Sequence, residues 1–173
     1  MAHLDNIMYV VCDASSTIRR YNTDTHQLLN VINIKGMGRP LDIIICRDDR
    51  QLYISDWNYI WRVAVDNRSC VNWVKWLTIE MVIWNSLSLM SRRLLVASCL
   101  PPALCQYNTT NRQLQCVVAL PQYMTFLWHG VETTRGTFVI SHRGTLNTFQ
   151  SAVSELFSFV NYQHITVFSS TSR

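Results

Sequence analysis

The chain has 173 residues, of which 49% are hydrophobic and 15% are charged, and its formal net charge is +4. This composition supplies enough apolar material for a core and excludes a disordered chain. The arginines are spread along the sequence without a basic block, which excludes a dedicated nucleic-acid tail but still allows a weak attraction to RNA.

The apolar segments and the cysteines bear on membrane association and on redox state. Asp5 interrupts the start of the chain where a signal peptide needs an apolar run, and Glu80 interrupts the most apolar later window, residues 76–90. We therefore expect a soluble protein without a membrane partner, with the cytoplasm favoured as its compartment. The six cysteines form no C-x-x-C pair, so free buried thiols are favoured and no cofactor is expected.

An internal repeat organises the sequence. Residues 106–118 repeat the pattern of residues 20–32, with Tyr-Asn-Thr at the start of both copies and Gln-Leu four positions further on. The two copies are 86 positions apart, which is twice 43, and the midpoint falls at residues 63–74. A fixed period of this length is typical of a repeat architecture.

A second element has the same period. Strand-like runs of β-branched and aromatic residues end at Asp13, Asp56, Ser98 and Ser141, at steps of 43, 42 and 43 positions. A repeat of about 40–50 residues with about four short strands is typical of a β-propeller blade. The sequence therefore predicts an all-β fold, a β-propeller of about four blades that are four-stranded antiparallel sheets.

The predicted blades cover most of the chain as one array over residues 1–168, with a tail at 169–173. We expect blades at residues 7–32, 41–75, 85–119 and 126–168. The first blade is expected to lack its opening strand, with strands at 7–12, 17–21 and 27–32. The fourth is expected to have strands at 126–132, 137–141, 151–157 and 163–168.

The second repeat carries a family resemblance. Pro40, the apolar run 43–45, Tyr-Ile-Ser-Asp at 53–56 and Ile-Trp-Arg at 60–62 follow the order of an NHL repeat. The YWTD repeat is related in pattern. The resemblance implies a propeller, usually six-bladed, that binds proteins or RNA, whereas some relatives with related blades are lactonases or strictosidine-synthase-like enzymes. It also implies that Asp56 and Asp13 are structural pegs that hold the following turn.

The length raises the question of ring closure, because a six-bladed ring needs about two more blades of this size. We favour part of a larger six-bladed propeller, although a four-bladed ring and an open arc remain alternatives. An open edge would favour self-association. In another alternative, residues 164–168 close the first blade.

Histidines and cysteines near the predicted hairpins are candidate chemical groups. His129, His142 and Glu132 are favoured as turn or surface residues over metal ligands, since two histidines and one glutamate in a single hairpin rarely suffice. Ser141 and His142 are neighbours in a strand and point to opposite faces, so they form no nucleophile–base pair. A hairpin centred at residues 110–111 would place Tyr107 opposite Leu114 and Cys105 opposite Cys116, as a disulfide or as two reduced thiols.

The candidate binding residues are one tryptophan and several arginines. Most tryptophans are expected to pack between blades, and Trp57 is the best candidate for exposure because it follows Asp56 in a turn. Arg19, Arg20, Arg62 and Arg143 are expected to form a basic rim. We expect a non-enzymatic scaffold that binds a protein partner, with an RNA-binding propeller or a six-bladed hydrolase relative as alternatives.

Overall fold

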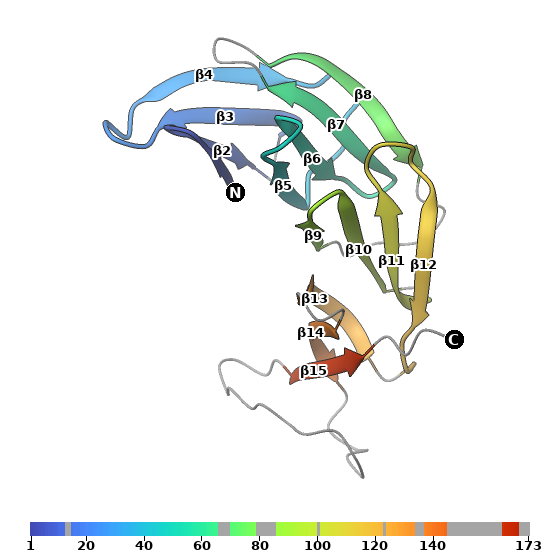
Figure 1. Cartoon of the computed structure of the whole chain (residues 1–173). Coiled ribbons are helices and arrows are strands. Elements are labelled where there is room, and N and C mark those ends of the chain that lie inside the picture. The colour runs from blue at the N-terminus through green and yellow to red at the C-terminus, as the bar shows by residue number, and fades with distance from the viewer. Residues whose placement is uncertain are drawn as a thin grey trace. The chain divides into compact units, whose positions relative to one another are not determined.

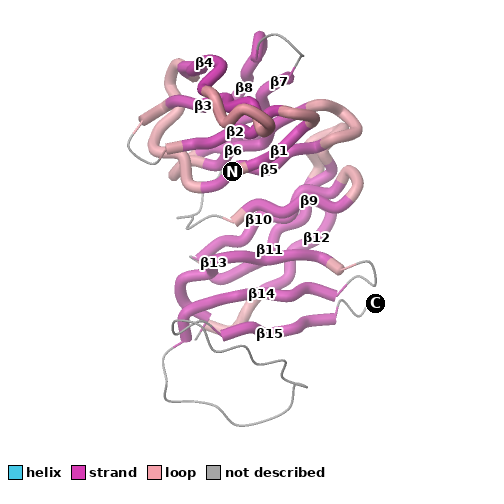
Figure 2. The backbone as a smooth tube through the Cα atoms, turned by 90° about the vertical axis from the view of Figure 1, so that its left-hand side faces the viewer, coloured by secondary structure: helices cyan, strands magenta, loops and turns pink. Residues whose placement is uncertain are grey.

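The computed structural model describes residues 1–12, 15–65, 70–78, 86–99, 101–122, 124–133, 137–144 and 164–169. Within these ranges every regular element is a β-strand, as Figures 1 and 2 show. The chain divides into two compact units, Met1–Glu80 (unit 1) and Met81–Arg173 (unit 2). No helix long and apolar enough to cross a membrane occurs in the described ranges.

Unit 1 contains two four-stranded antiparallel sheets whose strands follow chain order. The first sheet consists of β1 (Ala2–Leu4), β2 (Ile7–Val11), β3 (Thr17–Asn22) and β4 (Leu28–Asn33). The second consists of β5 (Asp42–Cys46), β6 (Gln51–Ser55), β7 (Tyr59–Val65) and β8 (Cys70–Thr78). Each strand pairs with the next one along the chain, so each sheet is a simple meander of the kind that the repeat predicted.

The described residues of unit 2 form one four-stranded and one three-stranded antiparallel sheet. The four-stranded sheet consists of β9 (Leu87–Met90), β10 (Arg93–Cys99), β11 (Pro102–Asn108) and β12 (Leu114–Ala119). The other consists of β13 (Met124–Glu132), β14 (Thr137–Gly144) and β15 (His164–Ser169). The prediction of an all-β chain built from antiparallel sheets of this size is confirmed.

The first sheet has an opening strand, contrary to the expectation that it would lack one. Strand β1 pairs with β2, with Ala2 opposite Tyr9 and Leu4 opposite Ile7. The expectation was wrong because β1 is only 3 residues long, too short to show a period of alternation. The turn that follows it places Asp5 at a φ of 51°, which non-glycine residues adopt mainly in tight turns.

The last sheet also differs from the expectation. Strand β15 pairs directly with β14, with Phe138 opposite Phe168, in the place expected for residues 151–157. Those residues lie outside the described part of the chain. The alternative in which residues 164–168 close the first sheet is wrong, since β15 extends the sheet of β14 and the first sheet has β1 as its opening strand.

The repeat extends to the hydrogen bonds of the turns. The Asn22 side-chain oxygen accepts the backbone N–H groups of residues 24 and 25 at 2.9 and 2.8 Å. The Asn108 side-chain oxygen accepts those of residues 110 and 111 at 2.8 and 3.2 Å. Each turn closes on a residue with positive φ, His26 at 56° and Arg112 at 64°. The Tyr-Asn-Thr echo in the sequence is therefore a repeated Asx turn.

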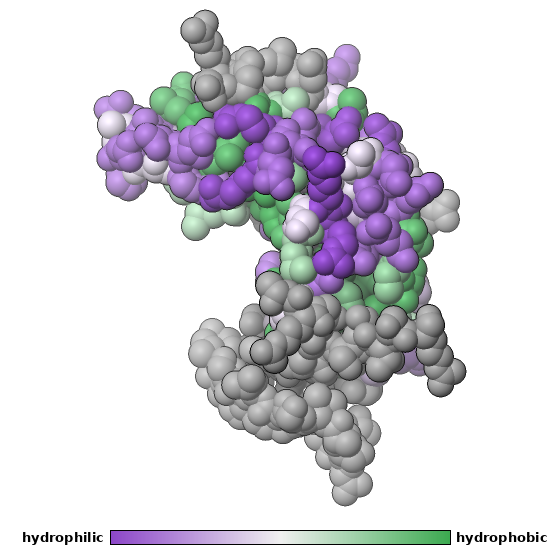
Figure 3. Space-filling view, viewed as in Figure 1, coloured by the Kyte–Doolittle hydropathy of each residue, from purple (hydrophilic) through white to green (hydrophobic). Residues whose placement is uncertain are grey.

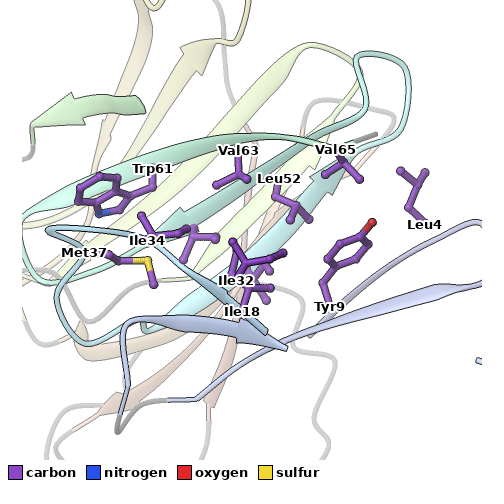
Figure 4. Close-up of a cluster of buried hydrophobic side chains, with 12 residues drawn as sticks. Leu4, Tyr9, Ile18, Ile32, Ile34, Met37, Leu52, Trp61, Val63 and Val65 are labelled. Atoms are coloured by element: carbon purple, nitrogen blue, oxygen red, sulfur yellow. The ribbon is translucent and has the colours of Figure 1, made fainter. Parts of the chain in front are cut away.

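The core of unit 1 draws side chains from both of its sheets. Figure 4 shows residues of the first sheet and the loop after it pointing toward residues of β6 and β7. This buried cluster consists of Leu4, Tyr9, Ile18, Ile32, Ile34, Met37, Ile43, Leu52, Ile54, Trp61, Val63 and Val65. Burial of this apolar surface stabilises the pair of sheets, because a fully buried side chain of this size contributes roughly 1.5–3 kcal/mol.

The core of unit 2 is built in the same way. Side chains of β10 and β11 pack with those of β13 and β14 in a cluster of Leu95, Ala97, Leu104, Leu120, Met124, Leu127, Phe138 and Ile140. Gly130 lies where β13 approaches this cluster, and a Cβ atom there would be 3.3 Å from Leu104 Cδ2. The glycine therefore lets the backbone of β13 come close to the neighbouring sheet.

Candidate interaction surface

Asp56 is a buried carboxylate whose two oxygens are both occupied. Its Oδ1 accepts the backbone N–H groups of Asn58 and Tyr59 at 2.9 and 2.8 Å. Its Oδ2 accepts the backbone N–H of Gly38 at 2.9 Å and the indole N–H of Trp61 at 2.7 Å. The side chain thus connects the turn after β6 to the loop after β4 and to the core of unit 1. Asp56 is 2% exposed and has no face open to a ligand.

The equivalents of Asp56 differ from it. Asp13 lies outside the described residues. The Ser98 hydroxyl donates to the carbonyl of Pro101 at 3.1 Å, and the Ser141 hydroxyl donates to the carbonyl of His129 at 3.5 Å. Ser141 lies within β14, and its bond runs across the ladder to β13, so it does not repeat the role of Asp56 at a turn.

The tryptophans divide between the core and the surface. Trp61 and Trp76 are each 2% exposed, and Trp73 packs against the buried cluster of unit 1. Trp76 also meets Tyr53 edge to face, with 5.3 Å between ring centroids. Trp57 is partly exposed in the turn between β6 and β7. Trp84, by contrast, lies outside the described residues.

The candidate arginines occupy different environments. Arg19 is exposed and Arg62 is partly exposed, and they hold the same position in the repeat, on β3 and β7. Arg20 is 2% exposed and its guanidinium lies 5.7 Å from the centre of the Tyr9 ring, so its assignment to a basic rim was wrong. The burial follows from strand alternation, which turns neighbours to opposite faces. Arg143 on β14 is opposite Thr125 on β13 in the ladder, and its side chain is not described.

Exposed apolar side chains gather on the outermost strands. Among the described residues, every exposed large hydrophobic residue except Met1 lies on β4, β8 or β12. The set is Leu28, Leu29, Val31, Val74, Leu114 and Val117. Single exposed apolar residues are ordinary on a protein surface, whereas their concentration on one class of strand is informative. In Figure 3, apolar residues reach the surface of the first sheet among polar ones.

Three of these residues repeat with the period of the sequence. Val31, Val74 and Val117 are 43 positions apart and are 50%, 41% and 54% exposed. Sequence reasoning missed them because an exposed and a buried valine look alike in a strand. Their spacing was the available signal.

Two of the valines lie beside the candidate arginines. Val31 is directly opposite Arg19 in the β3–β4 pair, and Val74 is directly opposite Arg62 in the β7–β8 pair. Directly opposite residues in a sheet share a face, with their Cβ atoms about 4.5–5.5 Å apart. Each sheet of unit 1 therefore presents a basic and an apolar side chain together. By strand alternation each pair lies on the face of its sheet that is turned away from the shared core, so the two pairs lie on opposite sides of unit 1. We call these pairs and the exposed Leu28 and Leu29 the outer-strand surface.

The charges of this surface have no acidic partner within the described residues. Arg50 pairs with Asp5 at 2.9 Å, and Arg93 pairs with Glu132 at 3.1 Å. Neither Arg19 nor Arg62 forms a comparable ion pair with the part of the chain that the structure describes. Their guanidinium groups are therefore open to an acidic partner.

The candidate metal ligands Glu132 and His129 contact other side chains of unit 2. The Glu132 carboxylate accepts a hydrogen bond from the Gln106 amide at 2.7 Å in addition to its ion pair with Arg93. His129 Nδ1 is hydrogen-bonded to the hydroxyl of Ser86. Ser86 is 1% exposed, so this hydroxyl cannot reach a substrate from solvent. The side chain of His142 is not described.

The predicted pairing of Cys105 with Cys116 is wrong. Tyr107 is opposite Leu114 as expected, but a bulge between Gln106 and Tyr107 shifts the register by one residue. Cys116 is therefore opposite Gln106, whereas Cys105 is opposite Val117, and both cysteines are free. Burial raises the pKa of the Cys105 thiol, and it also raises the pKa of the neighbouring Tyr107 to about 12.

Comparisons with known proteins identify the fold. The chain is similar to the hydrazine synthase of Kuenenia stuttgartiensis, with a TM-score of 0.69 and 14% identity over 96% of this chain and 48% of that chain. It is also similar to the WD40 repeats of RRP9, with a TM-score of 0.63 and 14% identity over 80% of this chain and 42% of that chain. It thus spans less than half the length of each of these structures.

The class of protein follows from these matches and from the sheets. WD40 repeats are β-propeller blades of four antiparallel strands, like the meanders of this chain. The chain therefore has a β-propeller fold, as the repeat predicted. No protein-family model matches its sequence, and no curated protein matches it either.

Proposed function

We propose that this chain is a non-enzymatic protein-interaction scaffold, an NHL-like propeller that binds a protein partner through the outer-strand surface. The NHL resemblance of residues 38–63 supports the assignment, because propellers of that type mostly bind proteins or RNA. The WD40-repeat neighbour supports a scaffold of the same architecture. Trp57, partly exposed in the turn between β6 and β7, is the candidate aromatic contact.

The observation that carries the proposal is the recurrence of valine beside arginine. Val31 with Arg19 and Val74 with Arg62 are 43 positions apart, and each pair lies on the face of its sheet that is turned away from the core of unit 1. Arginine is enriched among the residues that dominate binding at protein interfaces, and an apolar side chain exposed beside it gains free energy when a partner covers it. Because each valine is about half exposed, covering one contributes roughly 1 kcal/mol.

The partner surface should be acidic and apolar. The chain carries a formal net charge of +4, and Arg19 and Arg62 have no acidic partner within its described residues. Carboxylates of a partner would form charge-assisted hydrogen bonds with these guanidinium groups. Complementary charge of this kind raises the rate of association and selects among partners.

The test compares partner capture by matched variants in cells. Val31→Lys with Val74→Lys places charge in the outer-strand surface, and Thr110→Lys with Gln122→Lys adds the same charge at exposed turn residues of unit 2. Proximity labelling with quantitative mass spectrometry should recover the partners with wild-type protein and with the control variant, but not with the valine variant. Recovery of the same partners by the valine variant would contradict the proposal.

RNA is the second candidate, and Arg19 and Arg62, which have no acidic partner in the part of the chain that the structure describes, favour it. An electrophoretic shift with single-stranded RNA should then weaken steeply with salt, because binding releases counterions from the phosphates. Arg19→Gln with Arg62→Gln would abolish the shift, whereas Val31→Ala with Val74→Ala would leave it unchanged. A shift with this pattern would favour RNA over a protein partner.

A further inference from the structure

We propose that strand β4 binds an acidic, extended peptide segment of another protein, which adds to the first sheet as a further antiparallel or parallel strand. The inference deepens the proposed function and rests on it, since it names the partner and its mode of binding at one part of the outer-strand surface. Four properties of β4 carry it: its position, its backbone, its composition and the cation beside it.

Strand β4 is the edge of its sheet. The strand order is β1-β2-β3-β4, so among the described strands β4 has a hydrogen-bonded neighbour on one side only (Figure 1). Every residue of β4 except Ile32 is exposed. The side of β4 away from β3 is therefore a row of backbone groups accessible to another chain.

The backbone register shows which groups of β4 face outward. The N–H of Ile34 donates to the carbonyl of Ser16 at 3.1 Å, so this pair is hydrogen-bonded across the ladder. Hydrogen-bonded and non-hydrogen-bonded pairs alternate in an antiparallel sheet. Ile32 therefore bonds to β3, whereas Val31 and Asn33 direct their N–H and C=O groups to the open side. These groups are the ones that an added strand would pair with.

The composition of β4 does nothing to block such pairing. Natural sheet edges usually carry charges, proline or other features that prevent the addition of a strand. The sequence of β4, Leu-Leu-Asn-Val-Ile-Asn, contains neither a charge nor a proline. A bulge at Leu29 distorts its start, which leaves residues 30–33 as the regular part of the edge. A short extended segment fits this length.

The cation beside β4 selects the chemistry of the segment. Arg19 lies one strand inside the edge, opposite Val31 and on the same face. An added strand would lie about two strand spacings of 4.8 Å from β3, within the combined reach of arginine and glutamate side chains. A carboxylate on that face would meet a guanidinium that has no acidic partner among the described residues.

A second copy of this chain fits the edge less well. Its own β4 offers no acidic side chain, and its net charge has the same sign. In unit 2, β12 presents an equivalent edge, since the Leu120 N–H donates to the Pro102 carbonyl at 2.9 Å. The arginine, however, is replaced there by Cys105, which is 5% exposed. Charge thus distinguishes the β4 edge from the β12 edge.

The experiment uses the full chain and a fluorescein-labelled peptide of alternating valine and glutamate, with a valine–lysine peptide as the charge control. Fluorescence anisotropy should show binding of the glutamate peptide only. Asn33→Pro removes one outward N–H and should weaken binding roughly tenfold. Asn33→Ala keeps that N–H and should bind like wild type. Arg19→Gln should weaken binding several-fold and reduce its salt dependence.

Several results would overturn the inference. These are equal binding of the lysine peptide, unchanged affinity of Asn33→Pro, and self-association of the free chain that Asn33→Pro abolishes. If Asn33→Pro does not fold, glutamate peptides with N-methyl groups on alternate residues replace it. Only one of the two alternately methylated peptides carries its N-methyl groups on the residues that would pair with β4, and this peptide should not bind. Equal binding of the two peptides would exclude strand addition. Partner capture lost in the valine-to-lysine variant but kept in Asn33→Pro would refute strand addition and leave the proposed function intact.

Discussion

The indole N–H of Trp61 donates a hydrogen bond of 2.7 Å to Oδ2 of Asp56, and both residues are 2% exposed. The bond lies between the core of unit 1 and the turn at residues 56–59. Asp56→Ala would leave this indole and three backbone N–H groups without their acceptor. We expect it to lower the free energy of unfolding by about 3–5 kcal/mol, because each buried unpaired donor costs roughly 1–3 kcal/mol.

Urea denaturation followed by tryptophan fluorescence measures this loss. Asp56→Asn keeps one oxygen for the N–H groups of Asn58 and Tyr59, but it presents an amide NH2 group to the N–H donors of Gly38 and Trp61. It should therefore lower the free energy of unfolding by about 1–3 kcal/mol. Asp48→Asn changes an exposed aspartate of the same unit and should stay within about 0.5 kcal/mol of wild type. Equal stability of Asp56→Ala and Asp48→Asn would contradict the role given to Asp56.

The repeated Asx turns predict that two distant substitutions have similar effects. Asn22 and Asn108 each accept two backbone N–H groups of an exposed turn. Asn22→Ala and Asn108→Ala should each cost about 1 kcal/mol, measured as the opening free energy of the turn amides by hydrogen exchange. Asn22→Asp and Asn108→Asp keep the acceptor oxygen and should cost less. A large loss at one site with none at the other would show that the turns are not equivalent.

The repeat made the strands and their order predictable, because regular alternation and turn residues are written along the chain. The bulge between Gln106 and Tyr107 was not, since one extra residue leaves no mark in a strand of ordinary composition. It moved Cys105 away from Cys116 and so defeated the argument for their pairing. The contacts of Asp56 also divide into those that local sequence predicts and those that it does not. Those with Asn58 and Tyr59 are local turn chemistry, whereas those with Gly38 and Trp61 depend on tertiary packing.

The outer-strand surface could be predicted only in part. The sequence drew attention to Arg19 and Arg62, but it also suggested Arg20, which alternation buries against Tyr9. The valines beside these arginines are indistinguishable from core valines by composition. Their exposure depends on the position of β4 and β8 at sheet edges, which is a property of the assembled sheets.

Gly130 should be sensitive to the addition of a single methyl group. A Cβ atom there would be 3.3 Å from Leu104 Cδ2 and 3.8 Å from Leu95 Cδ2, and both leucines are buried and cannot readily move. Gly130→Ala is expected to lower the stability of unit 2 by about 1–2 kcal/mol in thermal or urea unfolding. Gly38→Ala is the matched variant, because its Cβ would be an ordinary 3.5 Å from Asp56 Oδ2. Equal effects of the two alanines would contradict the close packing at Gly130.

Tyr107 should make unit 2 sensitive to alkaline pH. Burial, with a smaller effect of Cys105, raises its pKa from 10.0 to about 12, so the folded state favours the neutral phenol. Stability from this group is fully present below pH 10.0 and is lost as pH rises toward about 12, because the unfolded chain releases the proton first. Tyr107→Phe cannot ionise and should lose less stability across this window, as measured by urea midpoints at successive pH values. The Cys105 pKa is raised from 9.0, also mainly by burial, so some dependence should remain in the variant. Identical pH profiles for wild type and Tyr107→Phe would show that the phenol does not contribute.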